Sequence, residues 1–338
     1  MSGATSSGPG RSDELASDLP IEESGERPAV ELAVAQEPRS EGSVLWRVGG
    51  VIRTIRPHQW VKNVFVLAPV VFAKEIFDPD LLLRAAGAFG VFCLLAGAVY
   101  TMNDLADVEA DRVHAVKRFR PIASGRVSIG TARFLAAVLV LFALTAAALA
   151  PSSFLLATAS YFIINLAYSL KLKHVAYLDV GCISAGFVLR VVAGGYATHI
   201  QISNYLVICT ALLALFLGFG KRQHELAVGE RAGKQRAALE SYTQRGLDIA
   251  LGVTAVATIA TYLAYTLDQH TRDFFRSDWL WLSTLFVVLG VGRFLHLVRS
   301  RPKAESPTQE MLRDGPFVGI VLFWAILVMW MVYHLRPG

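Results

Sequence analysis

Residues 81–102 have the sequence LLLRAAGAFGVFCLLAGAVYTM, an apolar run with one charged side chain, Arg84. A helix needs about 17–25 predominantly apolar residues to cross the roughly 30 Å hydrocarbon core of a bilayer, so this run predicts a membrane-spanning helix. Comparable runs recur on both sides of it. Together they predict nine spans, at about residues 60–77, 81–102, 131–150, 152–168, 178–198, 203–220, 247–267, 279–298 and 316–335. The first span is the weakest, because Pro69 interrupts it.

The composition of the whole chain agrees with this fold class. Of the 338 residues, 54% are hydrophobic and 17% are charged, and the mean hydropathy is +0.46. A typical soluble domain has about 25% charged residues, so the composition argues against a soluble globular enzyme and against a nucleic-acid-binding protein. Cys93, Cys182 and Cys209 lie within apolar stretches and indicate neither a disulfide framework nor a zinc site. We therefore expect an all-α membrane protein with nine transmembrane helices in a bundle.

The chain divides into three parts by charge and hydropathy. Residues 1–44 contain nine acidic and three basic side chains and no aromatic residue, which predicts a disordered acidic tail. Residues 45–58 place apolar side chains at helical spacing with arginines between them, which predicts an amphipathic segment lying on the membrane surface. Residues 59–338 form the predicted nine-helix domain. The net charge of +5 thus combines a tail of −6 with a remainder of +11.

The distribution of lysine and arginine predicts the orientation in the membrane. With nine spans, the segments on the N-terminal side of the membrane contain 22 of these residues, and the segments on the other side contain five. Basic residues are enriched on the cytoplasmic side of membrane proteins. We therefore expect a multi-pass protein of the inner (plasma) membrane, with its N-terminus and a cytoplasmic-facing active-site cavity on that side.

An acidic motif follows the second predicted span directly. The sequence NDLADVEAD begins at Asn103 and places Asp104, Asp107 and Asp111 at i, i+3 and i+7 of a continuing helix. Carboxylates crowded on one face repel each other unless a cation binds among them. Mg²⁺ suits such a site, because it takes one or two carboxylates together with oxygens of a phosphorylated substrate. We expect the three aspartates to hold Mg²⁺ and act in catalysis, with Asn103 beside the substrate. The alternative is a solvated helix end.

Polar side chains near the other cytoplasmic loops are candidates for binding a phosphorylated substrate. For the basic side chains just after the acidic motif, the alternative is that they are orientation signals or bind anionic lipid head groups. A charge inside a span is costly unless it faces a wet cavity or a partner, so Arg190 either neighbours the phosphate or metal site or pairs with a buried acid. For Lys221 and Arg222, the alternative is that they are stop-transfer charges. The candidates are Lys117, Arg118, Arg120, Tyr168, Lys171, Lys173, Asp179, Arg190, Lys221, Arg222 and Glu225.

These motifs resemble those of the UbiA superfamily of intramembrane prenyltransferases, over essentially the whole chain after residue 50. The resemblance rests on NDxxDxxxD from Asn103, KRFRPIASG from Lys117, and a Tyr-x-x-Lys…Asp motif from Tyr168 to Asp179. It implies a nine-helix fold, Mg²⁺ bound with a diphosphate at the first motif, and a second site that includes Asp179. The second motif departs from the usual pair of aspartates four residues apart, because the positions four residues before and after Asp179 hold valine and isoleucine.

Short basic motifs are similar to those of an actinobacterial branch of that superfamily, which makes decaprenylphosphoryl-5-phosphoribose for cell-wall arabinan. These motifs are RPHQWVKN at 56–63, YSLKLKHVAYLD at 168–179 and GKRQHEL at 220–226. The resemblance implies that the donor is phosphoribosyl diphosphate, that the acceptor is decaprenyl phosphate, and that Lys62 belongs to the substrate site. Because the lipid phosphate is already an anion, its attack on the ribose requires no strong general base.

Two other functions remain open on the sequence. A prenyltransferase that moves a polyprenyl chain from its diphosphate to an aromatic acceptor would use the same aspartates, but it would favour a second acidic pair. A cation transporter would place its carboxylates near the bilayer midplane, whereas these acids lie at a loop boundary. The sequence indicates membrane lipids and no nucleic acid among the partners, and it leaves open whether the chain forms a homo-oligomer.

Overall fold

The structure is a computed structural model that describes residues 43–232, 239, 241–300, 311 and 313–334. Within those ranges the chain is helical and contains no β-strand. The elements described below belong to one compact unit that starts at Val44. The predicted disordered tail, residues 1–44, lies outside the described residues except at its last two positions.

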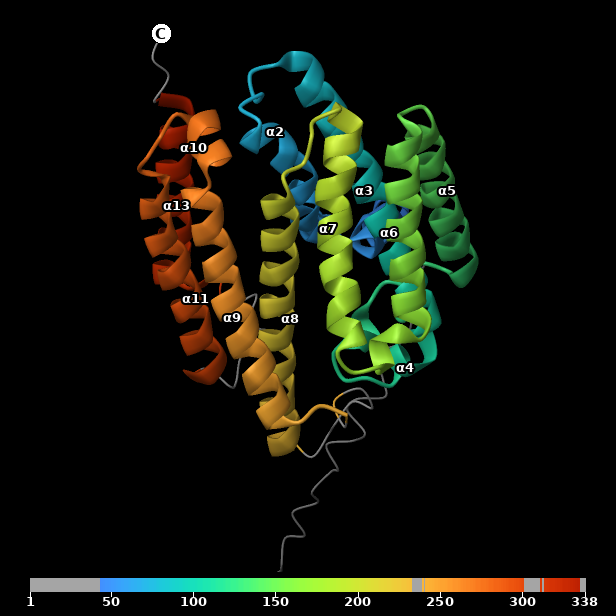
Figure 1. Cartoon of the computed structure of the whole chain (residues 1–338). Helices are drawn as coiled ribbons and strands as arrows, with labels where there is room; N and C mark the ends of the chain where they lie inside the picture. The colour runs from blue at the N-terminus through green and yellow to red at the C-terminus, as the bar shows by residue number, and fades with distance from the viewer. Residues whose placement is uncertain (1–42, 233–238, 240, 301–310, 312, 335–338) are drawn as a thin grey trace, which may run out of the picture. The chain divides into compact units, whose positions relative to one another are not determined.

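Eight helices are long and apolar enough to cross a membrane, in the part of the chain that the structure describes. They are α3 (Pro79–Ala106), α5 (Ile129–Ala148), α6 (Ser152–Leu170), α7 (Leu178–Thr198), α8 (Asn204–Ala232), α9 (Gln244–Leu267), α11 (Ser283–Ser300, after the short η5, Leu280–Leu282) and α13 (Gly315–His334) (Figure 1). The shorter elements are α1 (Val44–Ile55), η2 (Pro57–Leu67), α2 (Ala68–Phe72), α4 (Val108–Arg112), η3 (Lys117–Phe119), η4 (Leu172–His174) and α10 (Gln269–Phe275). The chain is therefore a multi-pass membrane protein with the all-α fold that the sequence predicts.

The first predicted span, residues 60–77, is not a single membrane-spanning helix. The chain forms the 3₁₀ helix η2, then the five-residue helix α2, and Lys74 turns the chain in the left-handed region at φ 65°. Pro69 lacks an N–H and lies in the first turn of α2, where a new helix tolerates it. A Cβ atom on Gly194 of α7 would lie 2.0 Å from the Val66 carbonyl oxygen, so the backbone of η2 rests directly on α7. The nine helices expected are therefore not confirmed: the described residues contain eight helices of sufficient length, and residues 60–77 form a broken helical segment.

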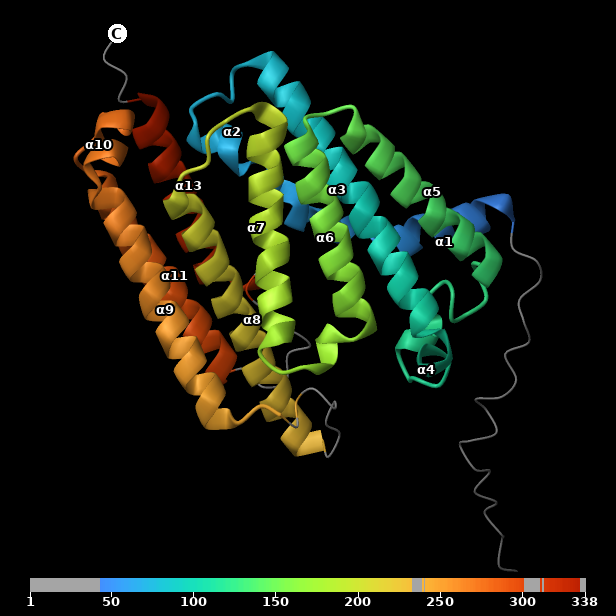
Figure 2. The ribbon, with the colours of Figure 1, turned by 45° about the vertical axis from the view of Figure 1, so that its right-hand side comes forward.

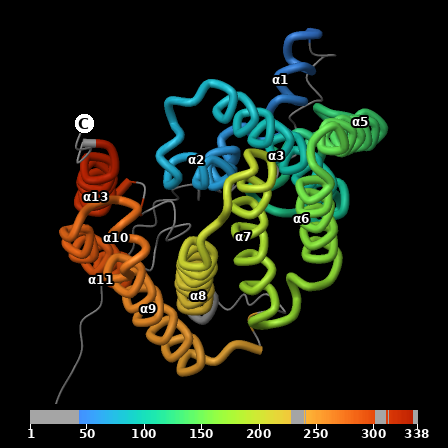
Figure 3. Tube along the Cα trace, turned by 45° about the horizontal axis from the view of Figure 1, so that its top comes forward, coloured from blue at the N-terminus to red at the C-terminus, as the bar shows by residue number. Residues whose placement is uncertain are grey.

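The long helices form two packed groups. Successive helices run antiparallel and lie side by side, with α6 against α7, α7 against α8 and α8 against α9 (Figures 1 and 2). One apolar core, around Phe92 and Tyr161, joins η2, α3, α5, α6 and α7. A second core, around Phe216 and Phe294, joins α8, α9 and α11. Figure 3 shows α8 between α7 on one side and α9, α11 and α13 on the other.

The predicted amphipathic segment forms the helix α1, Val44–Ile55. Its apolar side chains Leu45 and Ile52 are exposed. Arg126, just before α5, attaches the helix to the bundle: its guanidinium donates two hydrogen bonds to the Trp46 carbonyl oxygen and lies over the Trp46 ring. That the exposed face of α1 lies on the membrane surface remains a prediction.

Candidate active site

The acidic motif lies where α3 ends and α4 begins. Asp107 is the residue between the two helices, but the backbone hydrogen bonds continue across it. Its N–H donates to the Asn103 carbonyl oxygen at 3.0 Å, and the Asp111 N–H donates to the Asp107 carbonyl oxygen at 2.8 Å. Asn103, Asp107 and Asp111 therefore follow one another turn by turn, as the motif's spacing predicts.

Two of the aspartates are buried and share one arginine. Arg120 Nη1 lies 3.2 Å from Asp104 Oδ1 and 2.6 Å from Asp111 Oδ2. Arg56, which immediately precedes η2, also pairs with Asp104, at 2.5 Å. Lys117 Nζ lies 3.9 Å from Asp111 Oδ1. Cations of the chain itself thus neutralise two of the three carboxylates that we expected around Mg²⁺.

The third aspartate remains accessible. The Asp107 side chain is 40% exposed, and its carboxylate lies 3.4 Å from Lys173 Nζ, on η4. Beside it, Asn103 Oδ1 is buried and has no hydrogen-bond partner among the residues described. Amide and carboxylate oxygens are donors that Mg²⁺ accepts, and it needs only one or two carboxylates when a substrate supplies phosphate oxygens. Asn103 and Asp107 therefore fit a Mg²⁺ ion, although no three acidic, histidine or cysteine side chains converge within the described ranges.

Asp179, from the second motif, has a different environment. It is fully buried at the start of α7, and its Oδ2 lies 2.6 Å from Arg222 Nε, on α8. Its Oδ1 accepts hydrogen bonds from the Val180 N–H and from the Tyr242 hydroxyl. Burial and the hydrogen bond to Asp179 raise the pKa of Tyr242. These contacts occupy both carboxylate oxygens of Asp179, so the side chain is closed to a substrate.

The remaining candidates on α6 and α8 gather around Arg222. Glu225 forms an ion pair with Arg222 and a second one with Lys221 Nζ, at 3.8 Å. Tyr168, at the end of α6, interacts electrostatically with Arg222. Arg222 thus lies between two carboxylates and is neutralised within the protein. The expectation that it binds phosphate has no geometric support of the kind found around Asp107.

Arg190, inside α7, is bonded only to neutral groups in the described structure. Its Nε donates to Asn63 Oδ1, its Nη1 to the Gly186 carbonyl oxygen and its Nη2 to Tyr161 Oη, each at 2.8 Å. Asn63 belongs to η2, so these bonds connect η2, α6 and α7. Of the two roles expected for Arg190, pairing with a buried acid is therefore absent from the described residues.

Three further cations that we expected at the site are exposed. Lys171 follows α6, and Arg118 lies over the ring of Phe119 in η3. Lys62 lies on η2 and interacts electrostatically with Arg190 and Arg56. These three side chains remain accessible for a ligand.

Sequence reasoning missed two residues that organise these clusters. Arg56 is one of the basic residues that predict the orientation in the membrane, and the only sequence feature that points to a further role is its place in the motif RPHQWVKN. Tyr242, in the loop before α9, had no signal at all. Both contact aspartates more than 40 residues away, and spacing rules along one helix do not reach such pairs.

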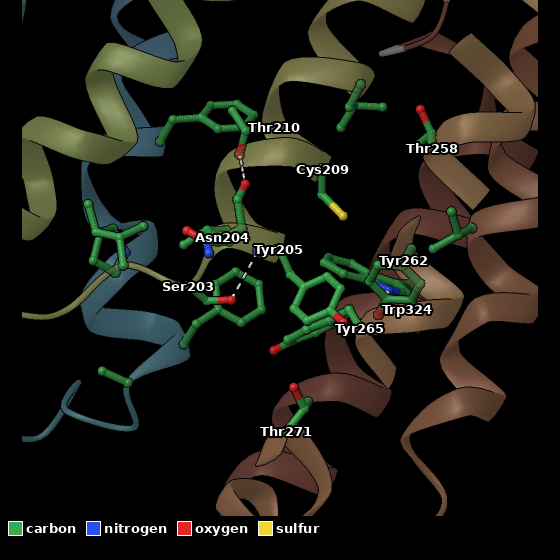
Figure 4. A pocket seen from close by; sticks show the side chains of 18 of the residues that line it. Ser203, Asn204, Tyr205, Cys209, Thr210, Thr258, Tyr262, Tyr265, Thr271 and Trp324 are labelled. Atoms are coloured by element: carbon green, nitrogen blue, oxygen red, sulfur yellow. Dashed lines mark hydrogen bonds between the residues drawn. The ribbon is translucent and has the colours of Figure 1, made fainter. Parts of the chain in front are cut away.

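An apolar cavity of about 1080 Å³ lies among η2, α2 and the helices α8–α13. Figure 4 shows the rings of Tyr205, Tyr262, Tyr265 and Trp324 around it. Trp324 Nε1 donates to Tyr262 Oη at 2.9 Å, so the polar atoms of these two rings are bonded to each other. Nine separate helical elements contribute residues to its wall, which is why no single stretch of sequence predicted it.

Comparison with known proteins identifies relatives over most of the chain. Residues 63–313 match the UbiA prenyltransferase family. The chain is 40% identical to a decaprenyl-phosphate phosphoribosyltransferase of Mycolicibacterium smegmatis, over 82% of this chain and 90% of that one. It is 35% identical to a decaprenyl-phosphate phosphoribosyltransferase of Corynebacterium glutamicum, over 84% of this chain and 87% of that one.

The fold is similar to that of a solved structure. A UbiA homologue from Archaeoglobus fulgidus, bound to DMAPP and Mg²⁺, superposes with a TM-score of 0.62 at 19% identity. The match covers 85% of this chain and 99% of the archaeal one. At this identity, the similarity establishes the shared fold.

Proposed function

The chain belongs to the UbiA prenyltransferase family, and we propose that it transfers the 5-phosphoribosyl group of phosphoribosyl diphosphate to decaprenyl phosphate, releasing diphosphate. The observation that carries the proposal is the identity of 35–40% with two decaprenyl-phosphate phosphoribosyltransferases over most of both chains. The closed environment of Asp179 also supports it. A prenyl diphosphate donor would favour a second open acidic pair, and Asp179 is already bonded to Arg222 and Tyr242.

The bond changes are simple. The bond between C1 of the ribose and the diphosphate oxygen breaks, and an oxygen of the lipid phosphate forms the new bond to C1. Positive charge develops at C1 and negative charge on the departing diphosphate. The acceptor oxygen carries no proton that must be removed, so the reaction needs no base among the side chains.

Side chains around Asp107 hold the donor in this proposal. Asn103 and Asp107 would hold Mg²⁺, and Asp111, which Arg120 and Lys117 neutralise, would lie beside them. When bound, the ion would neutralise charge on the departing diphosphate. Lys173 lies beside Asp107 and is placed to bind the diphosphate oxygens.

The other cations have two roles. The accessible Arg118, Lys117 and Lys171 are candidates for the remaining phosphate oxygens of phosphoribosyl diphosphate. Arg56 and Arg120 are positioning residues, because they hold Asp104 and Asp111 in place. Arg222 with Asp179 and Glu225 fixes α7 against α8. We further propose that this end of the helices faces the cytoplasm, where a soluble sugar phosphate is available and where basic loops are expected.

A two-tube assay tests the proposal. Purified full-length protein receives Mg²⁺ and labelled phosphoribosyl diphosphate with decaprenyl phosphate in one tube, and a labelled prenyl diphosphate with a phenolic acid in the other. We expect label in the lipid fraction of the first tube and no prenylated phenol in the second. Absence of labelled lipid in the first tube would contradict the proposal, and prenylated phenol in the second would favour the aromatic prenyltransferase.

A further inference from the structure

Arg190 is a buried cation without a buried anion beside it. The residue is 8% exposed, and its three hydrogen bonds go to an amide oxygen, a carbonyl oxygen and a phenol. No carboxylate pairs with it in the described part of the chain. A buried charge is costly unless a counter-ion neutralises it. The guanidinium has further N–H groups beyond these three bonds, so it can still donate to an anion.

Lys62, the residue before Asn63 on η2, supplies a second cation in the same region. The neighbouring Asn63 is the residue bonded to Arg190 Nε, and the charges of Arg190 and Arg56 both act on the Lys62 ammonium. Lys62 is accessible, and no ion pair or hydrogen bond of its side chain is found among the described residues. Arg56 is already paired with Asp104. Lys62 and Arg190 therefore form a positive site that lacks an anion.

The helix η2 connects this positive site to the apolar cavity. Side chains three residues apart lie on the same face of a 3₁₀ helix, so Lys62 and Phe65 share a face of η2. Phe65, and Pro69 one turn further, line the cavity. A ligand with an anionic head and a long apolar chain would therefore meet Lys62 with its head and the cavity with its chain. A sugar phosphate has no apolar part to place there.

We propose that Lys62 and Arg190 bind the phosphate of the polyprenyl phosphate acceptor. This inference rests on the proposed function and divides the cations between the two substrates. Lys62 and Arg190 take the lipid phosphate, and the cations around Asp107 take phosphoribosyl diphosphate. The 5-phosphate of the donor presents the same chemical group, so the test must separate the two sources.

The test measures binding without turnover, one ligand at a time, by calorimetry on the full chain in detergent. The ligands are decaprenyl phosphate, decaprenol, ribose 5-phosphate and phosphoribosyl diphosphate with Mg²⁺. Lys62→Gln is expected to weaken decaprenyl phosphate binding about tenfold or more, the effect of losing one charge-assisted hydrogen bond. Binding of the two ribose phosphates and of decaprenol is expected to stay unchanged. The control Arg53→Gln removes one exposed cation from α1 and should leave every ligand unaffected.

Two further variants keep the test decisive. Lys62→Arg retains the charge and should bind decaprenyl phosphate within about threefold of the wild type. Arg190→Lys loses the bond pattern to Asn63 and Tyr161, and should weaken decaprenyl phosphate more than decaprenol. Wild-type affinity of Lys62→Gln for decaprenyl phosphate would overturn the inference, and so would a loss confined to ribose 5-phosphate. Failure of the proposed function is distinguishable from failure of this inference. If only the proposed function fails, the wild type still binds decaprenyl phosphate but transfers no label.

Discussion

Two carboxylate clusters differ in what they leave accessible. Between α3 and α4, Asp107 keeps 40% of its side chain exposed and has Lys173 as a partner that a ligand can displace. At the start of α7, Asp179 is fully buried, and Arg222, Tyr242 and a backbone N–H occupy its oxygens. Both motifs contain an aspartate at a helix end, so residue type does not distinguish them. The difference lies in the partners, and it supports our proposal that the first cluster binds a ligand while the second holds helices together.

The largest expected effect comes from the open cluster. Asp107→Asn removes a negative charge that we propose faces Mg²⁺ and diphosphate, and we expect transfer to fall roughly 10²–10³-fold. The melting temperature should hardly change, because the carboxylate is half-exposed and its ion pair is weak. Initial rates and a thermal melt in the same detergent measure both quantities, and treatment of the wild type with EDTA should reproduce the loss of activity until Mg²⁺ is restored.

Glu109→Gln is the matched control for this variant. Glu109 lies two residues away on α4 and is exposed, and its one ion pair within the described ranges is with Arg112 at the surface. Its loss should leave the transfer rate unchanged. Wild-type activity of Asp107→Asn, or an equal loss in both variants, would contradict the assignment of ligand binding to Asp107.

The closed cluster should respond in stability. Asp179→Asn leaves Arg222 with Glu225 as its remaining carboxylate partner among the described residues. We expect the free energy of unfolding to fall by about 2–3 kcal/mol, somewhat less than the usual cost of breaking a buried ion pair. A lower melting temperature measures the loss, and the KM for phosphoribosyl diphosphate of the folded fraction should stay near the wild-type value. A raised KM with an unchanged melting temperature would instead place Asp179 in the substrate site.

The smallest effect is expected at the hydroxyl that covers Asp179. Tyr242→Phe deletes one hydrogen bond to a carboxylate, and we expect a loss of about 1.5 kcal/mol at neutral pH. Because the folded-state pKa of Tyr242 is raised, the hydroxyl stabilises the fold fully below the unfolded pKa of about 10, and this contribution is lost as the pH rises above it. Thermal melts between pH 7 and 11 should therefore show the wild type and the variant converging at the alkaline end. A constant difference across that range would contradict the role given to Tyr242.

The sequence predicted the fold class, because it depends on local patterns. Apolar runs long enough to cross a bilayer predicted the eight spans, and the spacing of Asn103, Asp107 and Asp111 predicted their succession on one helical path. At residues 60–77 the same hydropathy rule found the apolar run but not its conformation. It counts apolar residues and does not detect that η2 is a 3₁₀ helix resting on α7.

What the sequence could not predict is which charges meet. Spacing placed Asp104 and Asp111 among possible Mg²⁺ ligands, but Arg120 lies between them in the structure. Arg56 reaches Asp104 across 48 positions of the chain, and Tyr242 reaches Asp179 across 63. Such pairs depend on how the helices pack, which is a property of the whole bundle.

The contact between Gly194 and Val66 has a consequence for how this protein can vary. A Cβ atom at position 194 would lie 2.0 Å from the Val66 carbonyl oxygen, which leaves no room for any residue other than glycine. The obstacle is a backbone atom, so no change of side-chain rotamer can relieve the clash. A methyl group at 194 would push η2 outward and take Lys62 and Asn63 with it. The residue at position 194 therefore limits this distance: a relative with another amino acid there must hold its counterpart of η2, and the side chains on it, farther from α7.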